Sequence, residues 1–409
     1  MAGLIKFDEV RALEDAAFGQ GATPTLLCRL LFPVWSVTVE AEIYDSEPYA
    51  LIDRYLEAGI ANGGLRTVAE LAGFYGLDRV LVDRAIRFLR SIGHLEPESG
   101  DGSLTLTEVG RMSVRTGRRY THALKDRRRL YFDGFTSRPL PSAYYEEPAV
   151  TFLDRAGIAT AMTESLPFTP VTAFGGAWFP PSALESLDKM PAPERVQHNL
   201  PEQVLRPQLV DAETLFLPAY VVRAHWNDRA GCLAYTQAAA GDEADPDWSR
   251  ICSSFPEIAV IMEVGLLDGS GNGDPNGREA SARRWIQERY SGRVDVAQGN
   301  GGLLTATLPP GAFRTESGGL PLSKLGSFVM MGSWFFRVWC TDEALRRRVL
   351  LERAEGYFKV AREADAATRL LAKLGRQLGL EHVSLPELRA MADKAGKARL
   401  TRQLDLLLA

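Results

Sequence analysis

Charged side chains recur at helical intervals in residues 79–90. Arg79, Asp83, Arg84, Arg87 and Arg90 are separated by one, three or four residues, which places them together on the outer side of a predicted helix. A guanidinium group is planar and carries a fork of N–H donors, so it can bind a carboxylate or a phosphate through two hydrogen bonds. The chemistry available to this segment is therefore the binding of anions.

A second group of oxygen-bearing side chains lies in residues 268–279, D-G-S-G-N-G-D-P-N-G-R-E. Oxygens at positions 1, 3, 5 and 9, Gly273 at position 6 and Glu279 at position 12 are similar to the calcium loop of the EF-hand. Pro275 stands where that family places an apolar residue, Gly265 interrupts the preceding helix, and the sequence has no sister loop. We therefore favour a solvated connecting loop and predict no metal site and no cofactor.

Other catalytic signatures are absent from the sequence. It contains no GxxxxGK[ST], GxSxG or HExxH motif, and no GxGxxG between a strand and a helix. The five histidines stand alone, and each is expected to be a satisfied polar residue rather than a base or ligand. The four cysteines are scattered and are expected to be free thiols. The catalytic residues stay unassigned, and the sequence neither assigns nor excludes an enzyme activity.

Two short helices with a tight turn between them are predicted around Gly76. Thr67 and Glu70 have the spacing of a capping box at the start of the first helix, and Gly76 can end it because glycine adopts positive φ at low cost. Asp78 can cap the second helix, which is predicted to run to about residue 92. Its inward stripe consists of Val82, Ala85, Ile86 and Leu89. Such a pair is typical of a helix-turn-helix.

A hairpin is predicted directly after the second helix. Gly93 can end that helix, and extended runs at 94–96 and 103–107 flank the turn-rich S-G-D-G of residues 99–102. The run L-T-L-T-E-V-G-R at 104–111 resembles the end of the wing in many bacterial winged-helix regulators. Residues 45–115, about one sixth of the chain, therefore resemble a winged helix-turn-helix, a DNA-binding fold.

The resemblance implies that the helix starting at Arg79 enters a major groove, with its arginines near base edges and phosphates. Residues 111–130 are predicted to continue as a strongly basic helix, which could grip flanking phosphates or pair with acidic groups of the central domain. Residues 63–130 hold 13 Lys or Arg and 8 Asp or Glu, so this region carries +5 in a chain of net charge −5. The expected DNA-binding residues are Arg79, Asp83, Arg84, Arg87, Arg90, Arg118 and Arg119.

These patterns favour a DNA-binding transcriptional regulator that contacts duplex DNA and has a central sensing or partner-binding domain. Two alternatives remain open. The protein could be a nucleic-acid-processing or defence-type enzyme targeted by the winged helix, or a scaffold subunit that uses it for protein docking, as winged helices also dimerise and dock. Double-stranded DNA is the expected partner, and a homodimer is allowed.

The fold class expected from the pattern of elements is α+β. The chain has 409 residues, 45% hydrophobic and 24% charged, which is typical of two or three globular domains. We predict an N-terminal region at 1–135 with the winged helix-turn-helix, a central α+β domain at 136–340 and a C-terminal helical region at 341–409. No apolar run is long enough to span a bilayer and no signal peptide is recognised, so a cytoplasmic protein without membrane contact is expected.

Several further elements are predicted from periodicity. Residues 24–31 are expected to be helical, residues 35–43 to form a strand, and residues 215–226 and 232–237 to form a hairpin. A helix at 248–264 is restricted by Pro256. The aromatic residues between Phe328 and Trp339 are expected to belong to the domain core rather than to stack on bases.

Overall fold

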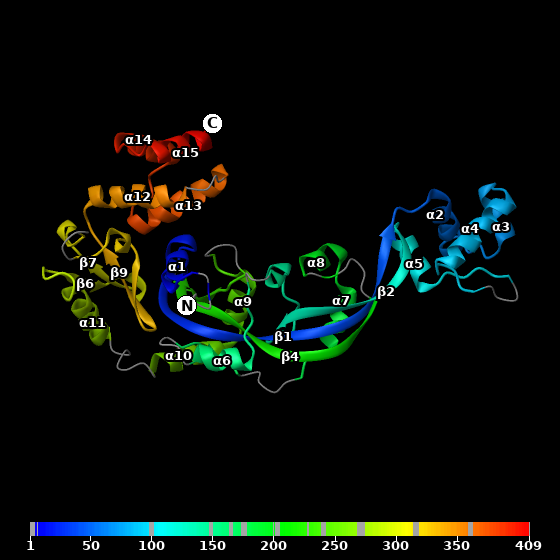
Figure 1. The fold of residues 1–409 in the computed structure, drawn as a ribbon, viewed down its shortest axis with the longest axis horizontal. Coiled ribbons are helices and arrows are strands. Elements are labelled where there is room, and N and C mark those ends of the chain that lie inside the picture. The colour runs from blue at the N-terminus through cyan, green and yellow to red at the C-terminus, as the bar shows by residue number, and fades with distance from the viewer. Residues whose placement is uncertain are drawn as a thin grey trace. The chain divides into compact units, whose positions relative to one another are not determined.

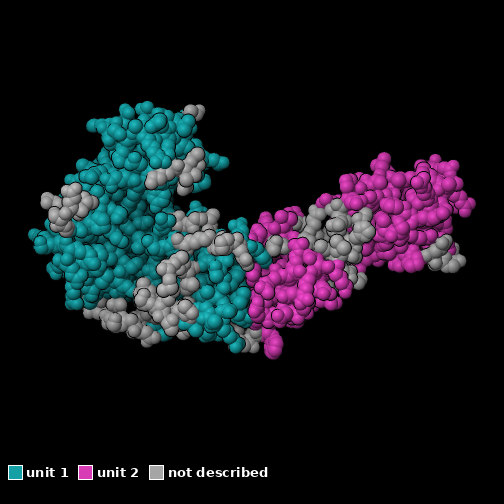
Figure 2. Space-filling view, in the orientation of Figure 1, with its two compact units in different colours: residues 1–34, 143–177, 214–409 teal, residues 35–142, 178–213 magenta. Residues whose placement is uncertain are grey.

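The computed structural model describes residues 5, 7–97, 102–146, 150–162, 167–172, 178–198, 200, 205–226, 229–238, 243–267, 275–313, 319–358 and 363–408. Helices and strands are mixed along the chain and the last part is helical, which confirms the predicted α+β class and the C-terminal helical segment (Figure 1). The chain divides into two compact units (Figure 2). Unit 1 comprises residues 1–34, 143–177 and 214–409, and unit 2 comprises residues 35–142 and 178–213.

Five strands form the larger sheet of the described part of the chain. Its order is β2-β1-β4-β5, and the short β3 pairs with β1 in parallel. The strands are β1 (Thr23–Glu47), β2 (Arg119–Asp133), β3 (Thr169–Pro170), β4 (Leu205–Trp226) and β5 (Arg229–Tyr235). β4 and β5 pair in antiparallel register from Tyr220 opposite Tyr235 to Trp226 opposite Arg229, which confirms the predicted hairpin.

Unit 1 also holds a small sheet of order β6-β7-β9-β8. Its strands are β6 (Asp295–Gln298), β7 (Leu304–Thr307), β8 (Phe328–Met331) and β9 (Trp334–Trp339). β7 and β9 are parallel, and the other two pairings are antiparallel. Phe328, Trp334 and Phe336 are buried in the hydrophobic cores of the unit, so the expectation that this aromatic cluster forms core is confirmed.

Helices of unit 1 cover these sheets. α11 contacts β6 and β7, α9 contacts β5, and α12 contacts α13, α14 and α15. Figure 1 shows α14 and α15 side by side near the C-terminus. The helices are α1 (Glu9–Glu14), α6 (Arg155–Met162), α9 (Pro246–Ser254), α10 (Pro256–Leu267), α11 (Pro275–Gln287), α12 (Glu343–Tyr357), α13 (Ala364–Leu378), α14 (Leu385–Lys394) and α15 (Ala398–Leu408), with a π-helix at Asp15–Gly19. Pro256 separates α9 from α10, as its missing N–H predicts.

Unit 2 contains a separate cluster of helices with its own hydrophobic core. Leu56, Leu71, Val82, Ile86 and Leu89 are fully buried against one another in this core. The cluster consists of α2 (Leu51–Ala61), α3 (Val68–Tyr75), α4 (Arg79–Ser91) and α5 (Glu108–Thr116). Elsewhere in the unit, α7 (Ser182–Lys189) packs on strand residues, and α8 (Ala192–Gln197) follows it.

The sequence signals around Gly76 form the predicted local structure. The Thr67 side chain accepts from the Glu70 backbone N–H, and the Glu70 carboxylate accepts from the Thr67 backbone N–H, which completes the capping box. Gly76 has φ +64° at the end of α3. The Asp78 side chain then accepts from the Val80 N–H and caps α4. These caps set the angle at which α4 leaves α3.

The predicted pairing of residues 94–96 with 103–107 is present. Leu95 and Leu106 form an antiparallel bridge, and the Glu96 N–H donates to the Thr105 carbonyl over 2.9 Å. The Thr107 N–H donates to the His94 carbonyl at the same distance. The turn predicted at 99–102 falls mostly on residues 98–101, which lie outside the described residues.

Two predicted helices were wrong, because both segments are strands. Residues 24–31 belong to β1, where Leu26, Leu27, Leu30 and Leu31 are all buried. Burial on both faces removes the alternation that identifies a strand. The basic helix predicted at 111–130 ends with α5, because Gly117 adopts φ +70° as its cap, and β2 follows from Arg119. The neighbouring basic residues thus lie along a strand.

Among the described residues, no helix combines the length and the apolar character that crossing a bilayer requires.

Gly76→Ala should destabilise the α3–α4 pair. A Cβ at φ +64° is strained by about 1 kcal/mol, although it would meet no neighbour within 4 Å. Exchange of the amide hydrogens of α3 and α4 should therefore be about fivefold faster, as measured by mass spectrometry. Gly73→Ala is the matched control, because Gly73 lies inside α3 with open space around it. This control should slow exchange, since alanine favours the helix by about 0.5 kcal/mol. Faster exchange in the control would contradict this account.

Candidate functional site

The candidate site is the solvent-facing side of α4. The inward side of this helix is packed as predicted, with Val82, Ile86 and Leu89 fully buried and Ala85 nearly so. On the opposite side, Val80, Arg84, Arg87 and Ser91 follow at intervals of four, three and four residues and are all exposed. We call these four residues the outer face of α4. The burial of one stripe fixes the rotation of the helix and thereby holds the outer face toward solvent.

One arginine of the outer face makes an ion pair within the helix. The Arg87 guanidinium donates through Nε to the Asp83 carboxylate over 3.0 Å, and Nη2 contacts the same carboxylate oxygen. Asp83 is half-buried beside Arg87. Its carboxylate binds this arginine, and its own negative charge would repel an anion. An exposed pair at this spacing contributes only about 0.3–0.5 kcal/mol, so an incoming phosphate could replace the carboxylate at low cost.

The remaining predicted arginines differ in their exposure. Arg79 is exposed at the start of α4, and Arg118 is exposed just before β2. Arg90 is half-buried, and its Nε is enclosed by protein atoms. Arg79 and Arg118 can therefore be reached by a ligand from solvent, whereas Arg90 is placed less favourably for one.

Arg119 is held inside unit 2. Its Nη2 donates to Glu47 over 2.5 Å and its Nη1 to Asp53 over 3.3 Å. The guanidinium carbon lies 5.3 Å from the centre of the Phe88 ring, and the side chain is 17% exposed. Its pKa lies above the ordinary value because of the hydrogen bond with Glu47 and the charge of Asp53. Arg119 thus pairs with acidic groups, but these lie at residues 47 and 53 of the predicted N-terminal region and not in the predicted central domain.

A buried ionisable cluster joins the elements that carry α4. His94 and Glu57 are fully buried, and the distance from His94 Nδ1 to Glu57 Oε1 is 2.7 Å. The other ring nitrogen, Nε2, lies 2.6 Å from the backbone carbonyl oxygen of Tyr120. A neutral imidazole has one N–H, but a carboxylate and a carbonyl both only accept. The geometry therefore fits an imidazolium that donates to both α2 and β2.

The electrostatics of His94 agree with this protonation state. Burial by itself lowers the pKa of a histidine, because it disfavours the charged form. The Glu57 carboxylate and the Tyr120 carbonyl oppose burial and leave the pKa of His94 above its ordinary value. Glu57 also accepts from the Tyr49 hydroxyl. Nearby Asp53 is buried as well, and burial raises the pKa of its carboxyl despite the neighbouring Arg119.

Sequence reasoning missed the apolar component of this surface. Val80 is 77% exposed on the outer face of α4, and Leu81 and Phe88 are exposed along one edge of it. Phe74 on α3 and Tyr55 on α2 are exposed as well. These residues fall outside the buried stripe of their helices, so their exposure could have been predicted from the sequence. The prediction considered only the charged residues of this surface.

Other chemistry is not assembled within the described part of the chain. No group of three or more histidine, cysteine or acidic side chains there could hold a metal ion. Most of the loop considered for calcium, residues 268–274, lies outside the described residues, while Glu279 accepts from Arg283 within α11. Cys28, Cys232, Cys252 and Cys340 are free thiols, as expected.

Comparison with protein-family models, with curated proteins and with solved structures found no match for this chain.

Replacing His94 should change both the stability and its pH dependence. Because the folded state raises the pKa of His94, the imidazolium stabilises the fold fully below about pH 6.5, and this contribution is lost as the pH rises through the folded pKa. His94→Gln leaves Glu57 without its cationic partner and should lower the free energy of unfolding by about 3 kcal/mol near pH 6. Urea denaturation followed by circular dichroism at several pH values measures both effects.

The exposed histidine His382 provides the control for this measurement. His382→Gln should retain the decline in stability above about pH 6.5, whereas His94→Gln should lose it. An unchanged pH dependence in the His94 variant would show that this histidine is not the protonated group.

Proposed function

We propose that this protein is a cytoplasmic DNA-binding regulator in which α2–α5 and the paired residues 94–96 and 103–107 act as a winged helix-turn-helix. In this proposal α4 enters the major groove of duplex DNA, and unit 1 senses a ligand or a partner. The observation that carries the proposal is the outer face of α4. It presents two exposed arginines from a helix whose other side is locked into a core.

The chemistry of this face suits a major groove, which is wide enough to admit one helix. Arg84 and Arg87 can bind phosphates or guanine edges, and the exposed Val80 methyl groups can pack against thymine methyls. Arg79, at the first turn of α4, and Arg118 extend the cationic surface. Arg119 forms ion pairs with Glu47 and Asp53. We therefore assign it to holding the start of β2 and not to contact with DNA.

Removing Arg84 and Arg87 together should weaken DNA binding. Each phosphate contact contributes about −0.9 to the slope of log affinity against log salt, so Arg84→Ala with Arg87→Ala should make this slope shallower by about 2. Fluorescence anisotropy of a labelled random-sequence duplex, titrated at about 50 and 200 mM salt, measures affinity and slope together. Thermal stability should change little, because both side chains are exposed.

Arg347→Ala with Arg348→Ala is the matched control, because it removes the same charge from α12 of unit 1. It should leave the affinity and the salt dependence as in the wild type. If both double variants weakened binding equally, the loss of affinity would reflect the net charge of the protein and not the outer face of α4. A wild-type protein that binds no duplex at low salt would overturn the proposal.

A second candidate function, self-association through the same helices, is favoured by the exposed apolar residues Leu81, Phe88 and Phe74. In this case the protein would form a dimer whose stability is insensitive to salt. Leu81→Ser with Phe88→Ser would convert it into a monomer in sedimentation velocity. A dimer that lacks duplex affinity would support this function in place of the first.

A further inference from the structure

An edge strand of unit 2 carries a run of exposed cationic side chains. β2 is the last strand on one side of the larger sheet, so one of its backbone edges has no partner strand among the described residues. The returning segment 138–140 covers only residues 131–133 of this edge. Just before the covered part, Lys125 and Arg127–Arg129 are all exposed. The open part of the edge is thus the basic part of the strand.

Side-chain alternation places two of these arginines on one face. Successive side chains of a strand point to opposite faces, so Arg127 and Arg129 lie on the face opposite to Leu130 and Phe132. Leu130 and Phe132 are buried in a hydrophobic core of unit 2, which directs the two arginines to solvent. Two residues along a strand span about 6.8 Å. We call Arg127 and Arg129 the β2 arginine pair.

The charges of the β2 arginine pair are not neutralised by acidic side chains of the described residues. Lys125 and Arg128, their neighbours in the run, already pair with Glu40 and Asp126. Within the described part of the chain, neither arginine of the pair forms an ion pair or a side-chain hydrogen bond. Two like charges held this close repel each other, and bound anions relieve the repulsion.

An extended pair of cations suits a polymer with regularly repeated negative charges. A guanidinium fork binds two oxygens of one phosphate, and a single small anion would reach only one of two forks held about 6.8 Å apart. An open strand edge adds backbone N–H donors between the side chains. Successive phosphates of a nucleic acid strand can occupy both arginines at once, because the backbone repeats its charge along its length.

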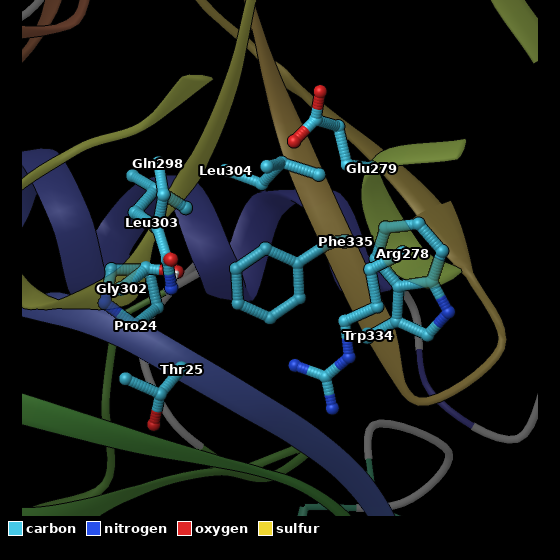
Figure 3. Close-up of a pocket in the computed structure, with 10 residues that line it drawn as sticks. All are labelled: Pro24, Thr25, Arg278, Glu279, Gln298, Gly302, Leu303, Leu304, Trp334 and Phe335. Carbon is cyan, nitrogen blue, oxygen red and sulfur yellow. Dashed lines mark hydrogen bonds between the residues drawn. The ribbon is translucent and has the colours of Figure 1, made fainter. Parts of the chain in front are cut away.

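A pocket in unit 1 provides a contrast, because its charged side chains are already engaged. It lies between the start of β1, the first turns of α11 and the start of β9 (Figure 3). Its cation, Arg278, has its guanidinium carbon 6.0 Å from the centre of the Trp334 ring and has partners within the chain. Its carboxylate, Glu279, accepts from Arg283 over 3.0 and 2.8 Å. The β2 arginine pair, by contrast, is open to a ligand from solvent.

The start of β2 is held beside α4. The guanidinium carbon of Arg119, the first residue of β2, lies 5.3 Å from the centre of the Phe88 ring of α4. Arg127 follows eight residues later, about 27 Å along the strand, which corresponds to roughly eight base pairs of duplex DNA. The β2 arginine pair is therefore too far along the strand to contact the groove segment that α4 would enter.

We infer that the β2 arginine pair binds the phosphate backbone of the same duplex DNA, outside the segment that α4 contacts. The inference rests on the proposed DNA binding by α4. Phosphate contacts of this kind add affinity and hold the protein in position without reading sequence. Two such contacts contribute about −1.8 to the slope of log affinity against log salt.

The test measures the anisotropy of a labelled random-sequence duplex with the full-length protein at about 50 and 200 mM salt. Arg127→Gln with Arg129→Gln should weaken binding at least about tenfold at the lower salt and make the slope shallower by about 2. Arg127→Lys with Arg129→Lys keeps both charges and should retain most of the slope. When Arg84→Ala and Arg87→Ala are added to the glutamine variant, the loss of slope should reach about 4, because distant sites act independently.

Arg284→Gln with Arg293→Gln is the matched control, because it removes two exposed charges from unit 1. It should bind as the wild type does. Circular dichroism and gel filtration establish that each variant is folded and unaggregated. If the β2 glutamine variant bound like this control while the α4 double variant bound weakly, the inference would be wrong and the proposed function would stand. A wild-type protein that binds no duplex would overturn both.

Discussion

The buried contact of His94 with Glu57 and Tyr120 is the constraint on which the candidate DNA-binding surface depends. His94 follows directly after α4, Glu57 lies on α2, and Tyr120 begins β2. Taking a charged pair out of water costs several kcal/mol, so such a pair is stable only when every donor and acceptor is satisfied. Satisfying both ring nitrogens therefore fixes three elements relative to one another, and with them the direction of the outer face of α4.

Local signals predicted the ends of the helices that carry the candidate site. Thr67, Gly76 and Asp78 act through neighbours within a few residues, so their caps could be identified without knowledge of the tertiary structure. The buried and exposed stripes of α4 follow from helical geometry alone. What the sequence could not provide was the role of His94, because its partners lie 37 and 26 residues away and no short motif joins them.

The extended strands were harder to predict for physical reasons. β1 is covered on both faces around Leu30, so its apolar run resembles a helix as closely as a strand. In β2 the run Arg127–Arg129 is exposed throughout, whereas Leu130 and Phe132, which follow it, lie in the core. The pocket of unit 1 was equally hidden, because its lining comes from four separate segments that only the tertiary structure brings together.

The discontinuous units have a consequence for the order of folding during synthesis. Unit 2 needs residues 178–213 to cover its strands, but the helices α2–α5 occupy one short stretch with mostly local neighbours. Such a stretch can fold soon after it leaves the ribosome. Unit 1, by contrast, joins residues 1–34 to residues beyond 214, so its first strand must wait for most of the chain. The early apolar run around Leu30 therefore stays uncovered until residues beyond 214 have been synthesised.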